Sequence, residues 1–417
     1  MGFEPQTTVS ASAARRRHGY SLPQEFYVSR EIFECDLDVF FHRHWIVVGL
    51  EIDIPEEGDV FKVDVGKTSI LLVRDDDGAA RAFHNVCRHR GARLVDEGKT
   101  SVGRLVCPYH QWTYDLNGDL AYAAHMGANL DKCALGLKPV HLKSIGGILM
   151  VCLAEEAPDD IDAVAAIMEP RLKPYDLGNA KVAHQIDLVE KGNWKLAIDN
   201  NRECYHCSSS HPELANSLNV LDIGFDPAEL TSEQRAEYDV HKRMMEAETA
   251  KWEAEGYPSS LVERMADCAT LLRTQRFAIE GAGESHTLDT NSACRKLLGA
   301  VPAKRFGDLH LWTHNSWHHF LSDHAVVTHL IPLSPGETLV RTRWLVHRDA
   351  VEGVDYDLAR LIEVWKATNQ QDADLVARAQ KGVQSTGYAP GPLSTFTERL
   401  VDLNVQWYLD RLDAHAS

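Results

Sequence analysis

The sequence has no long hydrophobic run and no surplus of basic residues. Its longest apolar candidate, Gly146 to Ala154, has the length of a strand, whereas a membrane-spanning helix needs about 20 apolar residues. Lysine and arginine number 43 against 61 aspartates and glutamates, and nucleic-acid binding needs clustered cations. The N-terminus also lacks the apolar core of a secretory signal. These absences predict a cytoplasmic protein that neither crosses a membrane nor binds nucleic acid.

The remaining composition is that of a folded protein. The chain has 417 residues, of which 44% are hydrophobic and 25% are charged. This length suits one large domain or two ordinary ones. Nine cysteines are an odd number, and in a reducing compartment cysteines near histidines indicate metal ligation before disulfides.

The pattern of strands and helices changes along the chain and predicts an α+β protein. Residues 45–155 contain short strands separated by the turn signals Asp77-Gly78 and Asn117-Gly118, which predict a small all-β domain. Residues 156–417 contain helices, strands joined by a turn at Ser334–Glu337, and a long helix from about Tyr356 to Gln384. They predict a larger domain with an antiparallel sheet flanked by helices. We expect residues 1–44 to pack on this larger domain.

A first motif combines cysteine and histidine. Cys87 and His89 form C-x-H, seventeen residues follow, and Cys107 and His110 form C-x2-H. Two thiolates and two imidazoles can hold a structural zinc ion. Zinc modules favour paired cysteines, however, whereas here each half supplies one cysteine and one histidine. The spacing therefore favours a Rieske [2Fe–2S] cluster, in which two histidines replace two cysteines on one iron.

A second motif lies in the larger domain and contains Glu203, His206 and His211. Glu203 and His206 are three residues apart, so on a helix they share a face. Pro212 disfavours helix at the preceding residue, which lets the His211 ring fold back towards His206. An oxygen-activating iron binds two histidines and one carboxylate, so a third ligand is expected downstream.

The periodicity of the late helix supplies a candidate carboxylate. Asp372 lies seven residues from both Trp365 and Ala379, on the predicted buried stripe. A carboxylate there needs a cation or a hydrogen-bond donor. Asp374 falls on the opposite, solvated side. Periodicity therefore selects Asp372.

The motifs CRHRG, CPYHQWTYDLNG and NNRECYHCSSSHPEL resemble those of the Rieske non-haem iron oxygenases. The resemblance implies an all-β Rieske domain and a helix-grip-like catalytic domain. It implies that Cys87 and Cys107 bind one iron of the cluster, and His89 and His110 the other. It also implies that a mononuclear Fe(II) is held by His206, His211 and Asp372, with O₂ as co-substrate.

The same resemblance gives roles to residues near the second motif. Glu203 joins the mononuclear site to the Rieske residue His110 of a neighbouring subunit, which requires a ring-like homo-oligomer, a trimer. Asn200 lies near the metal in relatives, although a plain helix position explains it equally well. Cys204 and Cys207 form a C-x2-C pair, which we interpret as packing residues.

The branch that this chain most resembles acts on quaternary ammonium compounds. The motifs NSWHHFLSDHAVVTHLIPLSP and VWKATNQQD are similar to those of glycine betaine monooxygenases and proline betaine (stachydrine) demethylases. They imply hydroxylation of an N-methyl group with release of formaldehyde, with a slight preference for proline betaine. Aromatic faces attract such cations, and the candidate walls are Trp312, Trp317, Phe320 and Trp344.

Alternative functions and the electron donor follow from the same motifs. A carnitine or choline oxygenase, an aromatic-ring dioxygenase, or an electron-transfer protein with a ligand-binding domain are the alternatives. The chain has neither a G-x-G-x-x-G motif nor a C-x4-C-x2-C ferredoxin run. An oxygenase of this kind therefore needs a separate NAD(P)H-dependent flavin or ferredoxin reductase.

Overall fold

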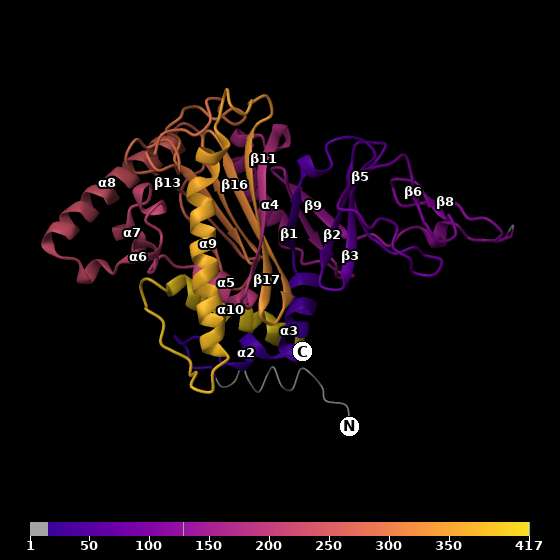
Figure 1. Ribbon diagram of the computed structural model, residues 1–417, viewed down its shortest axis with the longest axis horizontal. Coiled ribbons are helices and arrows are strands. Elements are labelled where there is room, and N and C mark those ends of the chain that lie inside the picture. Colours follow the sequence, from indigo (N-terminus) through magenta and orange to yellow (C-terminus); the bar gives the residue numbers. More distant parts are fainter. Residues whose placement is uncertain (1–15, 128, 417) are drawn as a thin grey trace. The chain divides into compact units, whose positions relative to one another are not determined.

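The computed structural model describes residues 16–127 and 129–416, which form two compact units (Figure 1). One unit is residues 40–159, and the other joins the described part of residues 1–39 to residues 160–416. Helices and antiparallel sheets occur together, so the predicted α+β class is confirmed. Within the described residues, no helix is both long and apolar enough to cross a membrane.

The smaller unit consists of short antiparallel strands. Three sheets have the orders β1-β10-β9, β4-β3-β2-β5 and β6-β7-β8. Glycines with positive φ stand at both predicted turns, Gly78 at 75° and Gly118 at 92°, which is the backbone conformation that only glycine adopts without strain. The strands are β1 (Ile46–Leu50), β2 (Asp59–Val65), β3 (Thr68–Arg74), β4 (Ala80–His84), β5 (Lys99–Ser101), β6 (Leu105–Val106), β7 (Thr113–Tyr114), β8 (Leu120–Tyr122), β9 (His141–Ile145) and β10 (Ile148–Cys152).

The larger unit is built on a seven-stranded antiparallel sheet of order β11-β17-β16-β15-β14-β13-β12. Its β16–β17 hairpin closes with Ser334 opposite Glu337, which confirms the predicted turn. The strands are β11 (Ala180–Glu190), β12 (Val262–Arg264), β13 (Leu272–Phe277), β14 (Asp308–Thr313), β15 (Ser316–Phe320), β16 (Ala325–Ser334) and β17 (Glu337–His347).

One long helix, α9 (Leu358–Val383), runs along this sheet (Figure 1). It buries Leu361 and Trp365 in a cluster with Trp344 of β17 and Val326 of β16. Residues paired across strands share a face, so the row containing Trp344, Val326 and His319 faces α9. The helix confirms the predicted periodic segment, and its sheet-facing side carries the second candidate site.

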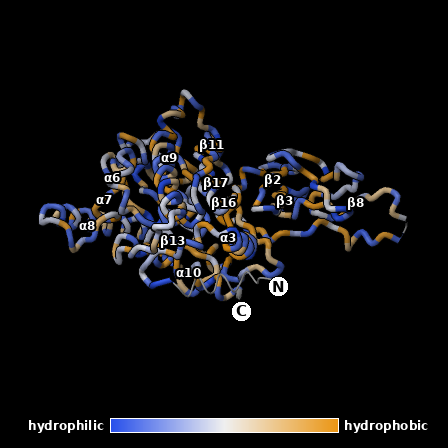
Figure 2. Tube along the Cα trace, turned by 60° about the horizontal axis from the view of Figure 1, so that its bottom comes forward, coloured by the Kyte–Doolittle hydropathy of each residue, from blue (hydrophilic) through white to orange (hydrophobic). Residues whose placement is uncertain are grey.

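Shorter helices surround the sheet. By hydropathy, α8 is largely hydrophilic, and hydrophobic residues concentrate in the strands (Figure 2). The helices are α2 (Glu25–Val28), α3 (Arg30–Asp36), α4 (Ile161–Leu172), α5 (Trp194–Asn201), α6 (Cys207–Ser210), α7 (Val220–Gly224), α8 (Ser232–Ala254) and α10 (Arg399–Ala416).

A buried ion pair anchors α5, the helix that leads into the second motif. Lys195 pairs with Asp36 of α3. Asp36 also accepts hydrogen bonds from Trp194 Nε1 (2.9 Å) and from the Tyr408 hydroxyl of α10 (2.6 Å). Asn193 caps the helix by accepting from Lys195 N (3.0 Å), as asparagine commonly does at this position. The N-terminal and C-terminal helices therefore both fix the position of α5.

Candidate functional site

Two loops of the smaller unit bring two cysteines and two histidines together. The loop after β4 carries Cys87 and His89, and the loop between β6 and β7 carries Cys107 and His110. A backbone hydrogen bond of 2.8 Å, donated by the cysteine N–H, closes each loop. The rings of His89 and His110 lie 4.6 Å apart, and both thiols are buried and free.

The donor atoms of these four side chains fit an iron–sulfur cluster. Nδ1 of His89 and Nδ1 of His110 are buried and have no hydrogen-bond partner among the described residues. Trp112 stacks on the His89 ring at 4.8 Å and fixes its plane. Buried polar nitrogens require a partner, and two imidazoles with two thiolates are the ligands of a Rieske cluster. The geometry therefore accommodates the expected group.

The second motif folds as a turn between two helices rather than as one helix. Helix α5 ends at Asn201 and α6 begins at Cys207, so the expected shared helical face of Glu203 and His206 is wrong. Glu203 and His206 lie in the turn between these helices instead. The expected helix end before Pro212 is confirmed, because α6 stops at Ser210 and His211 has an extended φ of −124°.

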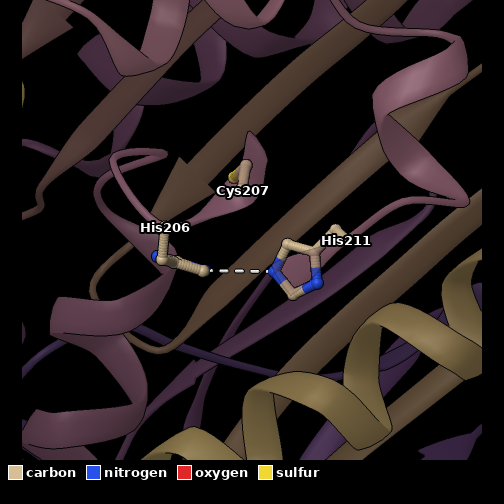
Figure 3. Close-up of side chains that lie close together, drawn as sticks. All are labelled: His206, Cys207 and His211. Atoms are coloured by element: carbon tan, nitrogen blue, oxygen red, sulfur yellow. Dashed lines mark hydrogen bonds between the residues drawn. The ribbon is translucent and has the colours of Figure 1, made fainter. Parts of the chain in front are cut away.

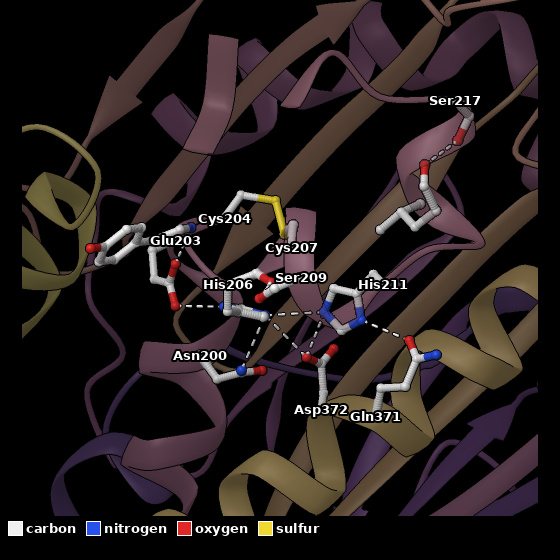
Figure 4. Close-up of a disulfide and its surroundings, with 12 residues drawn as sticks. Asn200, Glu203, Cys204, His206, Cys207, Ser209, His211, Ser217, Gln371 and Asp372 are labelled. Atoms are coloured by element: carbon white, nitrogen blue, oxygen red, sulfur yellow. Dashed lines mark hydrogen bonds and ion pairs between the residues drawn. A yellow bond between two sulfur atoms is a disulfide. The ribbon is translucent and has the colours of Figure 1, made fainter. Parts of the chain in front are cut away.

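Three side chains converge between this turn and α9. The Nε2 atoms of His206 and His211 lie 3.1 Å apart (Figure 3). Oδ1 of Asp372 lies 3.3 Å from the first and 3.0 Å from the second (Figure 4). Asp374 is exposed on the opposite side of α9. The structure thus brings together the three residues that periodicity and spacing selected.

Hydrogen bonds on the far side of each ring turn the two Nε2 atoms toward each other as possible metal ligands. His206 Nδ1 donates to Glu203 Oε1 (2.6 Å), and His211 Nδ1 donates to Gln371 Oε1 (2.8 Å). In neutral rings this leaves a lone pair on each Nε2. Two lone pairs and a carboxylate oxygen then face one another, which is repulsive without a positive charge. The arrangement matches the two-histidine, one-carboxylate site of non-haem iron enzymes.

The electrostatics of the centre also favour a cation. Burial lowers the pKa of His206, but Asp372 and Glu203 outweigh burial and raise that pKa to about 9. Burial raises the pKa of Asp372, but the two histidines hold it below its usual range. Two carboxylates therefore surround the imidazoles, and a metal ion can replace the proton that they attract.

One orienting residue was not found from the sequence. Gln371 precedes Asp372 on α9, accepts from His211 and donates to Glu213 Oε2 (2.9 Å). Partners on the far ring nitrogen fix the orientation of ligand histidines. In the sequence, only the position of Gln371 next to Asp372 pointed to a role for it.

Asn200 also lies near these residues. Its amide nitrogen is 3.3 Å from Nε2 of His206, so the structure puts Asn200 near the centre.

The two cysteines beside His206 are bonded to each other. Cys204 and Cys207 form a disulfide with Cα atoms 4.9 Å apart (Figure 4). The expectation that both are packing residues is therefore wrong. The turn between α5 and α6 brings their side chains together, and the disulfide closes the loop that carries His206.

The four aromatic candidates occupy different environments. Trp317 pairs with Trp312 on the sheet face covered by α9. Phe320 points to the opposite face, where its ring lies 5.5 Å from that of Tyr175, so it is not a wall of the centre. Trp344 is fully buried in the core beneath α9. Of the four, Trp312 and Trp317 therefore stay candidates for contact with a substrate.

Comparisons with known protein families match both units of the chain. Residues 44–139 match the model of the Rieske [2Fe-2S] domain, and residues 177–414 match the model of the ring hydroxylating alpha subunit (catalytic domain). The glycine betaine monooxygenase oxygenase subunit of Pseudomonas aeruginosa (strain UCBPP-PA14) is 43% identical over 98% of this chain and 93% of its own length. The carnitine monooxygenase oxygenase subunit of Escherichia coli (strain K12) is 33% identical over 50% of this chain and 56% of its own.

A solved structure has the same fold. The quaternary ammonium Rieske monooxygenase CntA in complex with L-carnitine aligns with a TM-score of 0.68 at 21% identity, over 100% of this chain and 99% of that chain.

Proposed function

The chain belongs to the Rieske non-haem iron oxygenase alpha subunits, which carry a [2Fe–2S] cluster and a mononuclear iron, and we propose that it hydroxylates an N-methyl group of a betaine. The convergence of His206, His211 and Asp372 is the observation that carries the proposal. Similarity to a glycine betaine monooxygenase over 98% of the chain supports the substrate class. Glycine betaine and proline betaine are the two candidate substrates.

We assign each group to residues of this chain. The ligands of the cluster are Cys87, His89, Cys107 and His110, and those of the mononuclear iron are His206, His211 and Asp372. When bound, these groups transfer electrons and activate O₂.

The protein's own contribution at the mononuclear site is orientation. Glu203 accepts from Nδ1 of His206 and keeps Nε2 of that ring turned inward. Gln371 does the same for His211. Because both rings have a fixed tautomer, neither has to reorient when substrate arrives.

The proposed reaction balances with one O₂ and two electrons. One oxygen atom enters a C–H bond of the N-methyl group, and the other is reduced with two protons to water. The resulting N-hydroxymethyl cation breaks its C–N bond, which leaves the tertiary amine, formaldehyde and a proton. The electrons come from NAD(P)H through a separate reductase.

Electron transfer between copies of the chain is part of the proposal. Glu203 contacts His206 and is only 14% exposed at its side chain, and we propose that it reaches His110 of the partner subunit in a homotrimer. A mixed assembly tests this directly. Subunits with Cys107→Ser lack the cluster, and subunits with His206→Ala lack the mononuclear iron. Co-expressed oligomers should recover activity that neither parent has, and failure to recover it would refute transfer between subunits.

Formaldehyde release tests the reaction itself. Iron-loaded protein, a Rieske reductase, NADH and air are incubated with glycine betaine, proline betaine, carnitine or choline. We expect formaldehyde from a betaine, and none from His206→Ala or Asp372→Ala, whose Rieske absorption should stay intact.

The substitution Asp374→Ala is the matched control, because Asp374 lies two residues away on the solvated side of α9. It should leave formaldehyde release unchanged. No formaldehyde from any of the four compounds, despite a reducible cluster, would overturn the proposal. Formation of a cis-dihydrodiol from an aromatic substrate would then identify a ring dioxygenase.

A further inference from the structure

The guanidinium groups of Arg202, which is fully buried, and Arg273, which is partly buried, lie against one indole ring. The Cζ atom of Arg202 is 4.6 Å from the Trp312 ring centroid, and that of Arg273 is 5.0 Å from it. Arg202 caps the C-terminus of α5, and Arg273 of β13 is the cross-strand partner of Trp312 on β14. The ring that sequence analysis assigned to a substrate cation therefore already contacts two cations of the protein itself.

The positive charge of Arg202 is not balanced by a hydrogen-bonded carboxylate. Arg202 is fully buried, and its guanidinium donates to Asn201 Oδ1 (2.7 Å) and to the Thr313 carbonyl, which are both neutral. Its Nε has no partner among the described residues. Burial lowers the pKa of Arg202, and Asp199, which offsets part of this, itself has a pKa raised to about 7 by burial.

The second arginine, Arg273, shares the one ion-pair partner that it has among the described residues. Arg273 Nε lies 3.5 Å from Glu263 Oε2 and makes no hydrogen bond within the described chain. Glu263 is already held by Arg399 through both carboxylate oxygens, at 3.0 and 2.8 Å. Burying a charge without a hydrogen-bonded counter-ion is costly. Among the described residues, the two arginines on the Trp312 ring therefore have one ion-paired carboxylate between them, that of Glu263, which Arg399 also holds.

This site adjoins the residues that orient the iron ligands. Arg202 stands between Asn201 and Glu203, and Glu203 is hydrogen-bonded to His206. Trp312 and its neighbour Trp317 lie on the sheet face that α9 covers, and α9 supplies Asp372. The segment that carries Arg202 therefore also carries the residue that holds His206, and Trp312 lies on the same sheet face as α9.

We propose that Arg202 and Arg273 bind the carboxylate of a betaine substrate, with Trp312 as the platform that holds both guanidinium planes. This inference rests on the proposed function and narrows it to quaternary ammonium compounds that carry a carboxylate. Arginine suits this role because its planar fork matches a carboxylate. Choline brings a cation without an anion, and the two guanidinium groups repel it.

Substitution of each arginine tests the site in turnover. Arg202→Met and Arg273→Met should each raise the KM for glycine betaine or proline betaine by about 10- to 100-fold, because each loses a charge-assisted hydrogen bond. Turnover of choline should not fall, because these substitutions remove a repelling charge and no contact with choline. Arg202→Lys keeps the positive charge but loses the two-pronged hydrogen bond, so its KM for the betaine should lie between those of the wild type and Arg202→Met. Arg341→Met is the control, since Arg341 also pairs with a carboxylate, that of Asp187, but near the surface of the sheet, and its KM should match that of the wild type.

A binding measurement separates failure of this site from failure of the proposed function. Calorimetric titration of the iron-loaded protein without reductase uses 3,3-dimethylbutanoate, which has the shape and carboxylate of glycine betaine but no positive charge. Binding that is lost in Arg202→Met supports the carboxylate site even if no formaldehyde is ever detected.

An unchanged KM and unchanged calorimetric binding in folded Arg202→Met and Arg273→Met would overturn the inference. Equal losses for betaine and choline would overturn it as well. Rieske absorption and thermal unfolding report whether each variant is folded. If Arg202→Met does not fold, Arg202→Lys and Arg273→Gln decide the question by the same readouts.

Discussion

The buried pair of Asp36 and Lys195 gives a sharp prediction about stability. The side chain of Asp36 is fully buried and that of Lys195 is 4% exposed. Asp36→Ala removes the counter-ion of Lys195 and the acceptor of two hydrogen bonds, from Trp194 and Tyr408. Removing one partner of such a pair costs about 3–5 kcal/mol, because the remaining charge is uncompensated.

The protonation of Lys195 sets an upper limit to this cost. A buried lysine without a counter-ion can become neutral by losing its proton. From an ordinary pKa near 10.4, this deprotonation costs about 4.6 kcal/mol at pH 7 but only about 1.9 kcal/mol at pH 9. Burial already lowers the pKa of Lys195, and Asp36 opposes this. Without Asp36, the loss of unfolding free energy should therefore shrink from about 3–5 kcal/mol at pH 7 to about 2 kcal/mol at pH 9.

Urea unfolding followed by circular dichroism at both pH values measures this difference. The matched control is Glu34→Ala on the same helix, because Glu34 pairs with Arg30 at the surface, at 2.7 Å. It should cost less than about 0.5 kcal/mol. The double variant Asp36→Leu with Lys195→Met should recover most of the lost stability. A cost below about 1 kcal/mol for Asp36→Ala at pH 7, or one that does not fall at pH 9, would refute the reasoning.

Three further predictions concern other parts of the larger unit. Burial lowers the pKa of His241, but hydrogen bonds to Asp222 and Glu280 outweigh it and raise that pKa to about 9. This stabilisation is fully present below about pH 6.5 and is lost as pH rises through about 9, so His241→Gln should flatten the fall in urea-unfolding free energy between these values. Gln371→Leu should weaken iron binding by about 10- to 100-fold in chelator competition. Gly307→Ala should lower the thermal midpoint, because φ is +70° and an added Cβ meets a backbone oxygen at 2.3 Å.

Each of these three predictions has a control variant for which a different result is expected. Lys242→Met, which removes the other ion-pair partner of Asp222, at 3.1 Å, should keep the pH dependence that His241→Gln loses. Gln370→Leu, one residue before Gln371 and exposed, should leave iron affinity unchanged. Gly353→Ala has a similar φ of +77° but open space around the Cβ, and should cost less than Gly307→Ala. If a variant and its control had equal effects, the physical cause given for that prediction would be wrong.

Features set by local rules were predictable from the sequence. The hairpin at Ser334–Glu337 follows from its turn residues, and the end of α6 before Pro212 follows from the steric effect of proline. The stripe of α9 follows from a period of 3.6 residues, and it placed Asp372 inward because a carboxylate on an apolar stripe requires a partner.

Features that depend on strand faces and turn geometry were not predictable. Strand β15, SWHHF, is buried on both faces, so it has no polar and apolar alternation from which to assign a side. For this reason Phe320 and Trp317 were grouped together, although register places them on opposite faces. The contacts of Trp312 with Arg202 and with Arg273 join residues 110 and 39 positions apart in the chain, and no local pattern encodes them.

The end of α5 links stability to both proposed binding sites. Asn200 and Glu203 contact His206, while Arg202, between them, turns to Trp312. A shift of this short segment must therefore move His206, the proposed iron ligand, and the inferred carboxylate site together. Because the Asp36 pair anchors α5 at its other end, Asp36→Ala should weaken iron affinity and betaine binding in parallel. Arg202→Met should instead change betaine binding alone, and this contrast separates loss of position from loss of a contact.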